Sequence, residues 1–261
     1  MALYDLPALN DALHGTILHG RLHHFPTIGS TNAAALEAAQ AGAPSGSVYF
    51  AEEQTAGRGR GGHTWHSPAG AGLYTSVLLR PVVSPAAALK ISLATGLAAQ
   101  AAIESVSGLQ ADIRWPNDLM LDGKKCGGIL VETAASADGE RFRHVVIGVG
   151  INVNHEAFPE ELRHLATSLR IESGIQQSMQ QLLAALLRNI AQEVAELEAG
   201  GEILERFAAA STWVRGKRVH VDDAAGYTGT TDGLDAHGFL RVRTEGGSER
   251  LVLSGGVREI N

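Results

Sequence analysis

Several features common in other proteins are scarce or missing here. The chain has one cysteine, Cys126, so it can form no internal disulfide and no zinc site built on cysteines, and this usage is typical of a reducing cytosol. The start, MALYDLPALN, lacks the basic and apolar segments of a signal peptide, so we expect a cytoplasmic protein. The most apolar long stretch, residues 86–103, is interrupted by Lys90, Ser92 and Gln100, which predicts a packed helix and not a membrane span.

An excess of positive charge is also missing. The 28 acidic residues outnumber the 21 Lys and Arg residues, which gives a formal charge of -7 with neutral histidines. Binding to nucleic-acid phosphates needs a basic face, so this charge argues against broad nucleic-acid affinity. The 261 residues, 44% of them hydrophobic, predict a globular protein of one or two domains with a substantial core.

Helix and strand signals alternate up to about residue 200. Ser30-Thr31-Asn32, then an alanine-rich run and Gly42, predict a helix with an N-cap and a glycine at its end. Further helices are predicted at 85–107 and 176–199, and strands at 47–54, 73–80, 111–115 and 145–153. Asp122-Gly123 separates two runs of strand formers and predicts a type I′ hairpin within residues 119–132.

After Trp213 the pattern changes to short alternating strands separated by glycines. Such a segment, about fifty residues long, is typical of a small β-barrel. The sequence therefore predicts two domains, an α+β domain at 1–212 and a small β domain at 213–261.

The segment GRGRGG, residues 57–62, matches G-x-G-x-x-G formally. A dinucleotide fold would need a helix directly after it and an acidic residue about twenty positions later, but HTWHSP follows and the next acid is Glu104. No Gly-Lys-Ser/Thr completes a P-loop, and the arginine-glycine unit is not repeated as in RGG segments. Two interpretations remain: a solvated hairpin loop, or a mobile loop whose amides and arginines bind an anion.

Two further segments carry polar or glycine residues at strand ends. In RWPNDLMLDGKKCGGILVE (114–132), Pro116 ends a strand, so that Asn117 and Asp118 lie at its tip, where an amide can read a base and a carboxylate can bind Mg²⁺. Gly127-Gly128 weaken the following strand, which a closely approaching ligand would explain. GVGIN (148–152) has glycines on one face of an apolar strand. Each segment alone also fits an ordinary turn or a buried strand.

Taken together, these segments resemble the biotin–protein ligases. The matching blocks stand in the family's order from about residue 25 to the C-terminus: GSTN (29–32), Q-x-x-G-R-G-R-x-x-x-x-W-x-S-P-x-G (54–70), L-Y-x-S-x-x-L-R-P (73–81), WPNDL (115–119), K-x-G-G-I-L-V-E (125–132) and G-x-G-I-N (148–152). The arginine loop together with WPND is specific for this family.

The resemblance implies a catalytic domain like those of class II aminoacyl-tRNA synthetases and biotin–lipoate ligases, a mixed sheet packed with helices, followed by an SH3-like β-barrel. It implies that biotin and ATP, with Mg²⁺, form biotinyl-5′-AMP and pyrophosphate. A lysine of a biotin carboxyl carrier protein, typically of acetyl-CoA carboxylase, then takes the biotinyl group.

The resemblance also implies roles for matching residues. The biotin-binding set comprises Ser30, Thr31, Asn32, Gln54, Gly57, Arg58, Lys125, Gly127 and Gly128. The ATP- and adenylate-binding set comprises Arg60, Trp65, Asn117, Asp118, Lys125 and Asn152, with Asp118 as the Mg²⁺ ligand. The residues that promote the reaction are Lys125, Arg60 and Arg58.

Three features depart from the family pattern. Further arginines commonly follow the position of Arg60, whereas this chain has Gly61, Gly62 and His63, and Arg114 replaces a common lysine. About twenty-five residues precede the domain, too few for the winged helix-turn-helix that lets some relatives repress transcription, so we expect no DNA binding. Nor do we expect membrane binding, and a homodimer remains open.

Alternatives remain at this point. A lipoate or octanoate ligase shares the fold and also acylates a carrier lysine, but lacks WPND. A non-catalytic biotin sensor would keep the pocket alone, although Lys125 argues for catalysis. We expect Trp115 to be a core residue, Trp213 to pack where the domains meet, and His63 and His66 to be solvated loop residues and not metal ligands.

Overall fold

The computed structural model describes residues 3–223, 226–253 and 255–260. The strands of its larger sheet are β1 (Leu22–Ile28), β2 (Ser47–Gln54), β3 (Gly72–Leu79), β4 (Asp112–Arg114), β5 (Asp118–Leu121), β6 (Lys124–Ala135) and β7 (Phe142–Asn152). The helices are α1 (Leu6–Ala12), α2 (Thr31–Gln40), α3 (Ala88–Ser107), α4 (Leu169–Ser173), α5 (Met179–Glu198) and α6 (Ile203–Ala210), with 3-10 turns η1 (Arg60–Gly62) and η2 (Pro85–Ala87).

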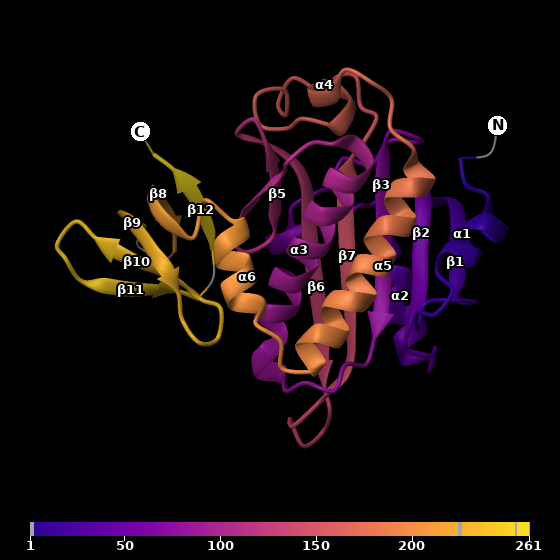
Figure 1. Cartoon of the computed structure of the whole chain (residues 1–261), viewed down its shortest axis with the longest axis horizontal. Helices are drawn as coiled ribbons and strands as arrows, with labels where there is room; N and C mark the ends of the chain where they lie inside the picture. The colour runs from indigo at the N-terminus through magenta and orange to yellow at the C-terminus, as the bar shows by residue number, and fades with distance from the viewer. Residues whose placement is uncertain (1–2, 224–225, 254, 261) are drawn as a thin grey trace.

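The seven strands form one mixed sheet in the order β1-β2-β3-β7-β6-β5-β4 (Figure 1). Only β1 and β2 run parallel, and every other neighbouring pair is antiparallel. The predicted α+β class is confirmed, and so is the hairpin at Asp122-Gly123, whose φ angles of 46° and 72° are those of a type I′ turn.

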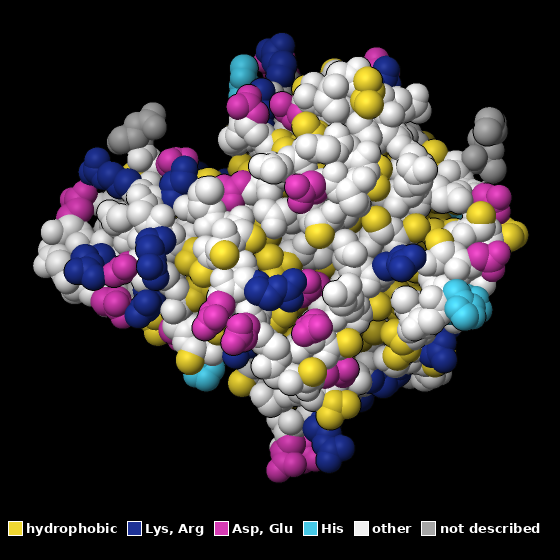
Figure 2. Space-filling view, in the orientation of Figure 1, with side chains coloured by type: hydrophobic (Ala, Val, Ile, Leu, Met, Phe, Trp, Pro, Cys, Tyr) yellow, Lys and Arg dark blue, Asp and Glu magenta, His cyan; other side chains and the backbone are white. Residues whose placement is uncertain are grey.

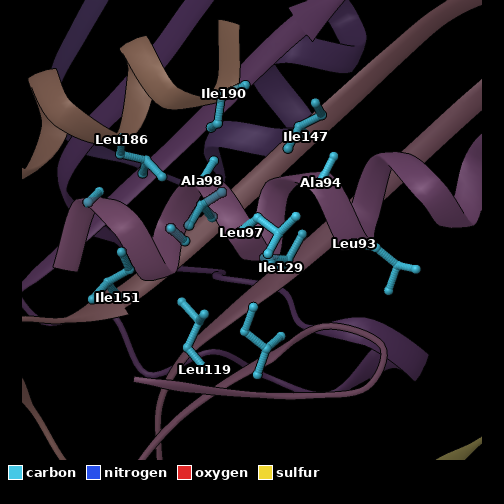
Figure 3. Packing of buried hydrophobic residues seen from close by; sticks show 14 of the residues in the cluster. Leu93, Ala94, Leu97, Ala98, Leu119, Ile129, Ile147, Ile151, Leu186 and Ile190 are labelled. Carbon is cyan, nitrogen blue, oxygen red and sulfur yellow. The ribbon is translucent and has the colours of Figure 1, made fainter. Parts of the chain in front are cut away.

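The sheet has a helix layer on each face. Along β7, Val145, Ile147 and Ile151 belong to the main core, in which α3 and α5 pack against the strands (Figure 3). Val146 belongs to a second, smaller core together with Ala35 and Ala39 of α2. Because successive side chains of a strand point to opposite faces, α2 covers the face opposite to α3 and α5.

Helix α3 with its preceding turn, residues 85–107, is long and apolar enough in composition to cross a membrane, and 56% of its most apolar window is buried inside the protein. Its residues Leu93, Leu97 and Ala98 lie among Ile129 and Ile147 of the sheet and Leu186 of α5 (Figure 3). It is therefore a core helix, as the interrupted apolar run predicts.

The C-terminal strands form a separate antiparallel sheet in the order β11-β10-β9-β8-β12. They are β8 (Arg215–Asp222), β9 (Tyr227–Leu234), β10 (Leu240–Thr244), β11 (Glu249–Val252) and β12 (Gly256–Glu259). Trp213 and Trp115 are both buried where this sheet meets the larger part, and the Trp115 indole donates a hydrogen bond to the Gly238 carbonyl. The boundary at residue 212 remains a prediction, since one apolar core includes residues from both sides of it.

On the face that carries α5 and α6, Lys and Arg side chains are mixed with Asp and Glu (Figure 2). This view shows no continuous basic surface, in keeping with the formal charge of -7.

Cys126 is fully buried, and burial raises the pKa of its thiol to about 12. It packs as an apolar residue in the core.

Histidine 155, in the loop after β7, is buried and stacks on Phe158 with ring centroids 4.8 Å apart. Burial, and next the nearby His66, lower the pKa of the His155 imidazole from 6.5 to about 4. As the pH falls, the imidazole takes up its proton near pH 6.5 in the unfolded chain but only near pH 4 in the folded protein. The free energy of unfolding therefore decreases as the pH falls from the first value to the second. We expect the melting temperature to drop between about pH 7 and pH 5, and to drop less in His155→Gln.

His63→Gln is the control for this pH dependence, because His63 is exposed in the loop after β2. It should keep the full drop in melting temperature. Equal pH profiles for His155→Gln and the unaltered protein would contradict the role assigned to His155.

Candidate active site

A pocket opens on the α2 face of the sheet, beside the start of α2. Gly128 of β6 lies opposite Gly150 of β7, and Gly148 lies opposite Ser76 of β3. Three neighbouring positions of this face carry no side chains, and they form the floor of a pocket that is open to solvent. The walls come from the start of α2, the end of β2, the loop after β2, and strands β6 and β7.

The pocket brings together ten of the fourteen residues predicted for the site. These are Ser30, Thr31, Asn32, Gln54, Arg58, Arg60, Trp65, Asn117, Lys125 and Gly128. The other four, which do not line it, are Gly57, Asp118, Gly127 and Asn152. These four residues lie behind the residues that line the pocket, and the contacts of each are described below.

The start of α2 forms the neutral polar end of the pocket. Ser30 caps the helix, and its hydroxyl accepts a hydrogen bond from the Ala33 amide. The Thr31 amide and hydroxyl lie 2.9 and 3.1 Å from Gln54 Oε1. Gln54 Nε2 donates in turn to Ser67 Oγ, so Gln54 ties the helix start to the loop after β2. These uncharged groups suit a ligand with amide-like polar atoms.

The loop after β2 is a small hairpin. The Gly59 amide bonds to the His63 carbonyl at 2.7 Å, and the Trp65 amide bonds to the Gly57 carbonyl at 3.0 Å. A Cβ at Gly57 would lie 2.6 Å from Ser67 Oγ and 2.7 Å from the Trp65 carbonyl oxygen. Gly57 is therefore required by the folding of the loop, and it does not reach the pocket.

Arginines from this loop form the cationic end of the pocket. Arg58 and Arg60 are exposed and line its mouth. Arg60 Nη1 lies 3.5 Å from both Asn117 Oδ1 and the Gly255 carbonyl, between the sheet and the C-terminal part. Weakly held guanidinium groups at a pocket mouth can turn toward an entering phosphate or carboxylate.

Trp65 lies over the glycine strands. A Cβ at Gly150 would be 2.5 Å from the indole Nε1, and a Cβ at Gly128 would be 3.5 Å from the ring. The indole Nε1 is buried and has no hydrogen-bond partner within the described part of the chain. The Lys125 ammonium lies 5.5 Å from the ring centroid, within cation–π range.

Lys125, at the start of β6, forms an ion pair with Asp118 Oδ1. Arg114 holds the other oxygen of that carboxylate, with Nη2 at 2.6 Å and Nε at 3.1 Å from Oδ2. Asp118 thus orients Lys125 from behind the pocket wall. No group of three or more His, Cys, Asp or Glu side chains suited to a metal occurs among the described residues.

Two asparagines support the backbone around Lys125. Asn117 Nδ2 donates to the Ile129 carbonyl at 3.1 Å. Asn152 is buried, and its Nδ2 donates to the Thr167 carbonyl at 3.0 Å. Gly127 faces the core and not the pocket, because a Cβ there would lie 2.8 Å from Leu119 Cδ1. Of the two glycines predicted to lie beneath the ligand, only Gly128 faces the pocket.

The sequence predictions missed two polar residues beneath the pocket, Ser76 and Glu132. The Ser76 hydroxyl contacts both Thr31 and Asn32, and the Glu132 carboxylate accepts from Asn32 Nδ2. Ser76 stands in the strand GLYTSVLL, of which every residue is buried. A hydroxyl in such a strand needs a polar partner, and this signal could have drawn attention to it.

We expect Gly150→Ala to displace Trp65, because the new methyl group would overlap the indole. Overpacking of this kind costs about 1–3 kcal/mol. The tryptophan emission should shift to the red and the melting temperature should fall. In a Trp65→Phe background the emission shift should vanish, and Gly246→Ala is the control, since its Cβ would meet only Thr244 Oγ1 at 3.9 Å. An unchanged emission spectrum in Gly150→Ala would contradict this placement.

Comparisons with known proteins agree with the resemblance seen in the sequence. Residues 24–152 match the biotin/lipoate A/B protein ligase family. A biotin–[acetyl-CoA-carboxylase] ligase of Mycobacterium tuberculosis is 35% identical over 236 residues, 87% of this chain and 84% of that protein. The structure of a biotin protein ligase from Aquifex aeolicus in complex with biotin and ATP is similar with a TM-score of 0.79 and 28% identity, over 92% of this chain and 100% of that one.

A bifunctional ligase/repressor of Bacillus spizizenii is 42% identical over 160 residues, 60% of this chain. The match covers 49% of that protein, so the chain spans about half the length of this relative. The likeness to the Aquifex structure extends across both sheets, whereas the Bacillus match is confined to a shorter part of the chain.

Proposed function

Because the chain belongs to the biotin–protein ligase family, we propose that it attaches biotin to a lysine of a biotin carboxyl carrier domain. In the first step a biotin carboxylate oxygen bonds to the α-phosphorus of ATP, the bond to the β-phosphate oxygen breaks, and pyrophosphate leaves. In the second step a neutral lysine amine of the carrier attacks the biotinyl carbonyl, and AMP leaves as the amide forms.

The observation that carries this proposal is the polarity of the pocket at the start of α2. Its inner end holds the uncharged groups of Ser30, Thr31 and Gln54, and its mouth holds Arg58, Arg60 and Lys125. A ligand with a neutral polar ring at one end and a carboxylate at the other fits in this direction. The carboxylate of such a ligand then lies beside Arg58, Arg60 and Lys125, where it meets the triphosphate of ATP.

Lys125 is the group we assign to the reacting phosphate. Adenylation brings two anions within bonding distance, so fixed positive charge lowers the barrier. The ion pair with Asp118 and the contact with Trp65 hold the ammonium at the pocket wall before substrates arrive. No nucleophile from the protein is needed, since the substrates react with each other and the enzyme supplies position and charge.

Adenine binding is assigned to Trp65 and the two asparagines. The indole face can stack on a base. Asn152 is buried behind the pocket wall with its Nδ2 on the Thr167 carbonyl, so its carbonyl oxygen would meet an adenine amino group only once this wall opens for the base. Asn117 lies beside Arg60, near the expected path of the phosphates.

We assign Mg²⁺ to the phosphates, with Asp118 as its protein ligand. Magnesium commonly takes one or two carboxylates and completes its shell with phosphates and water, so a single carboxylate fits. The ion would offset phosphate charge. Asp118 does not line the pocket, and Arg114 and Lys125 hold its two oxygens, so it would have to turn from one of them to reach the metal. We further assign the reaction to the cytoplasm, where the carrier's lysine and ATP are both available.

Transfer to a carrier domain tests the proposed function. The protein is mixed with ATP, biotin and an isolated biotin carboxyl carrier domain, and the mass of the carrier is followed. We expect one biotinyl group on one lysine, and none when that lysine is replaced by arginine. Transfer of lipoate or octanoate in place of biotin would assign the chain to the lipoate side of the family.

A further inference from the structure

Three charged side chains, Arg114, Asp118 and Lys125, stand in a row beside the pocket. Arg114 of β4 lies directly opposite Asp118 of β5, which in turn lies opposite Gly128 of β6. Directly opposite residues point to the same face of a sheet, so Arg114 and Asp118 share the face of Gly128. Lys125 reaches over Gly128, where an added Cβ would lie 3.3 Å from the Lys125 ammonium. The row therefore begins at the pocket and leads away from it across the sheet.

Two cations share one carboxylate in this row. Arg114 Nη2 and Nε donate to Asp118 Oδ2 at 2.6 and 3.1 Å, and Lys125 pairs with Asp118 Oδ1. The side chains of Arg114, Asp118 and Lys125 are 23%, 16% and 31% exposed, so water and salt screen their charges only in part. Arg114 already balances the charge of Asp118. The row therefore carries one net positive charge, at its pocket end.

Arg114 is held from its other side by the segment that leads into the C-terminal sheet. Its guanidinium carbon lies 5.4 Å from the ring centroid of the buried Trp213, within cation–π range. This segment is fastened to β4, because Ser211 Oγ donates to the Ile113 carbonyl at 2.6 Å. A planar guanidinium can stack on a ring and bond a carboxylate through its edge at the same time. Both contacts fix the place of Arg114 without any substrate.

We propose that Arg114 is a positioning residue for adenylation, which balances Asp118 and so keeps the charge of Lys125 available to the reacting phosphate. Arg114 does not line the pocket, so it acts through its neighbours and not on a substrate. Without Arg114, Lys125 would have to balance Asp118, and the remaining pair would carry no net charge. The inference rests on the proposed function, because it takes the formation of biotinyl-5′-AMP as the reaction.

Arg114→Gln tests this role, since glutamine keeps a hydrogen-bond donor but removes the charge. We expect kcat for pyrophosphate release, at saturating biotin and ATP, to fall roughly tenfold, the order of one charge-assisted hydrogen bond. The Kd for biotin, measured by calorimetry, should stay within about twofold, because the neutral end of the pocket is untouched. A general loss of structure would change both quantities. Arg114→Lys restores the charge and should recover most of the rate.

A double-mutant cycle with Asp118→Asn separates charge balance from a packing effect at Trp213. In the Asp118→Asn background no carboxylate is left to balance, so Arg114→Gln should change the rate by less than about threefold. A tenfold effect in both backgrounds would overturn the inference, and so would Arg114→Lys being as slow as Arg114→Gln.

The matched control is Arg218→Gln, because Arg218 is an exposed arginine that pairs with Glu245 at 2.9 Å and does not line the pocket. It should keep the rate of the unaltered protein. If the unaltered protein forms biotinyl-5′-AMP and Arg114→Gln forms it equally fast, the inference alone fails. If the unaltered protein forms none, the proposed function fails, and the inference fails with it.

Discussion

Lys125→Ala is expected to slow biotinyl-5′-AMP formation by roughly 10²–10³-fold, the usual loss when one preorganised charge is removed from a reacting site. Lys125 lines the pocket and is held by Asp118 and Trp65, so the alanine variant loses a charge already in place. Transfer from supplied biotinyl-5′-AMP to the carrier should continue appreciably, because that step needs less added charge at the α-phosphate.

The two half-reactions are measured separately for this variant, by pyrophosphate release and by carrier labelling from the supplied adenylate. Lys124→Ala is the matched control, since Lys124 neighbours Lys125 on β6 but does not line the pocket. It should behave as the unaltered protein. An equal loss in both half-reactions of Lys125→Ala would contradict a role confined to the first step.

Arg60→Gly is expected to let the intermediate escape. Arg60 comes from the loop after β2 and lies between Asn117 and the Gly255 carbonyl, so its guanidinium spans the pocket mouth. A charge-assisted hydrogen bond to the adenylate contributes about 1.5–3 kcal/mol, so dissociation should be roughly tenfold faster or more. Free biotinyl-5′-AMP and biotin on bystander lysines should both increase.

The escape is measured by filtering the protein from its small-molecule products and by probing an unrelated lysine-rich protein for biotin. Arg163→Gly is the control, because Arg163 is an exposed arginine that pairs with Glu160 and does not line the pocket. Normal adenylation in Arg60→Gly, without extra free intermediate or stray biotin, would contradict the retention role.

Local signals predicted much of the fold. The N-cap at Ser30, the type I′ turn at Asp122-Gly123 and the long amphipathic run of α5 are each encoded within a few neighbouring residues, and all three are present. β1 was missed because it is a partly buried edge strand that contains a proline. α4 and α6 were missed because helices of 5 and 8 residues are too short to show a clear period.

The sequence predicted most of the residues of the site but not how they are arranged. The strand glycines looked alike in the sequence, yet Gly128 faces the pocket and Gly127 faces Leu119 in the core. Ser76 and Glu132 meet Asn32 only because three strands and one helix come together there, at sequence separations of 44 and 100 residues. Strand pairing sets such contacts, and no single segment carries them.

The central claim is that this pocket adenylates biotin, and mass spectrometry of the first half-reaction tests it most directly. The pure protein is incubated with Mg²⁺, ATP and equimolar biotin and lipoate, without any carrier, and its bound small molecules are identified. We expect biotinyl-5′-AMP alone, and its much slower appearance with Lys125→Ala. A lipoyl-5′-AMP adduct, or no adduct at all, would contradict the account.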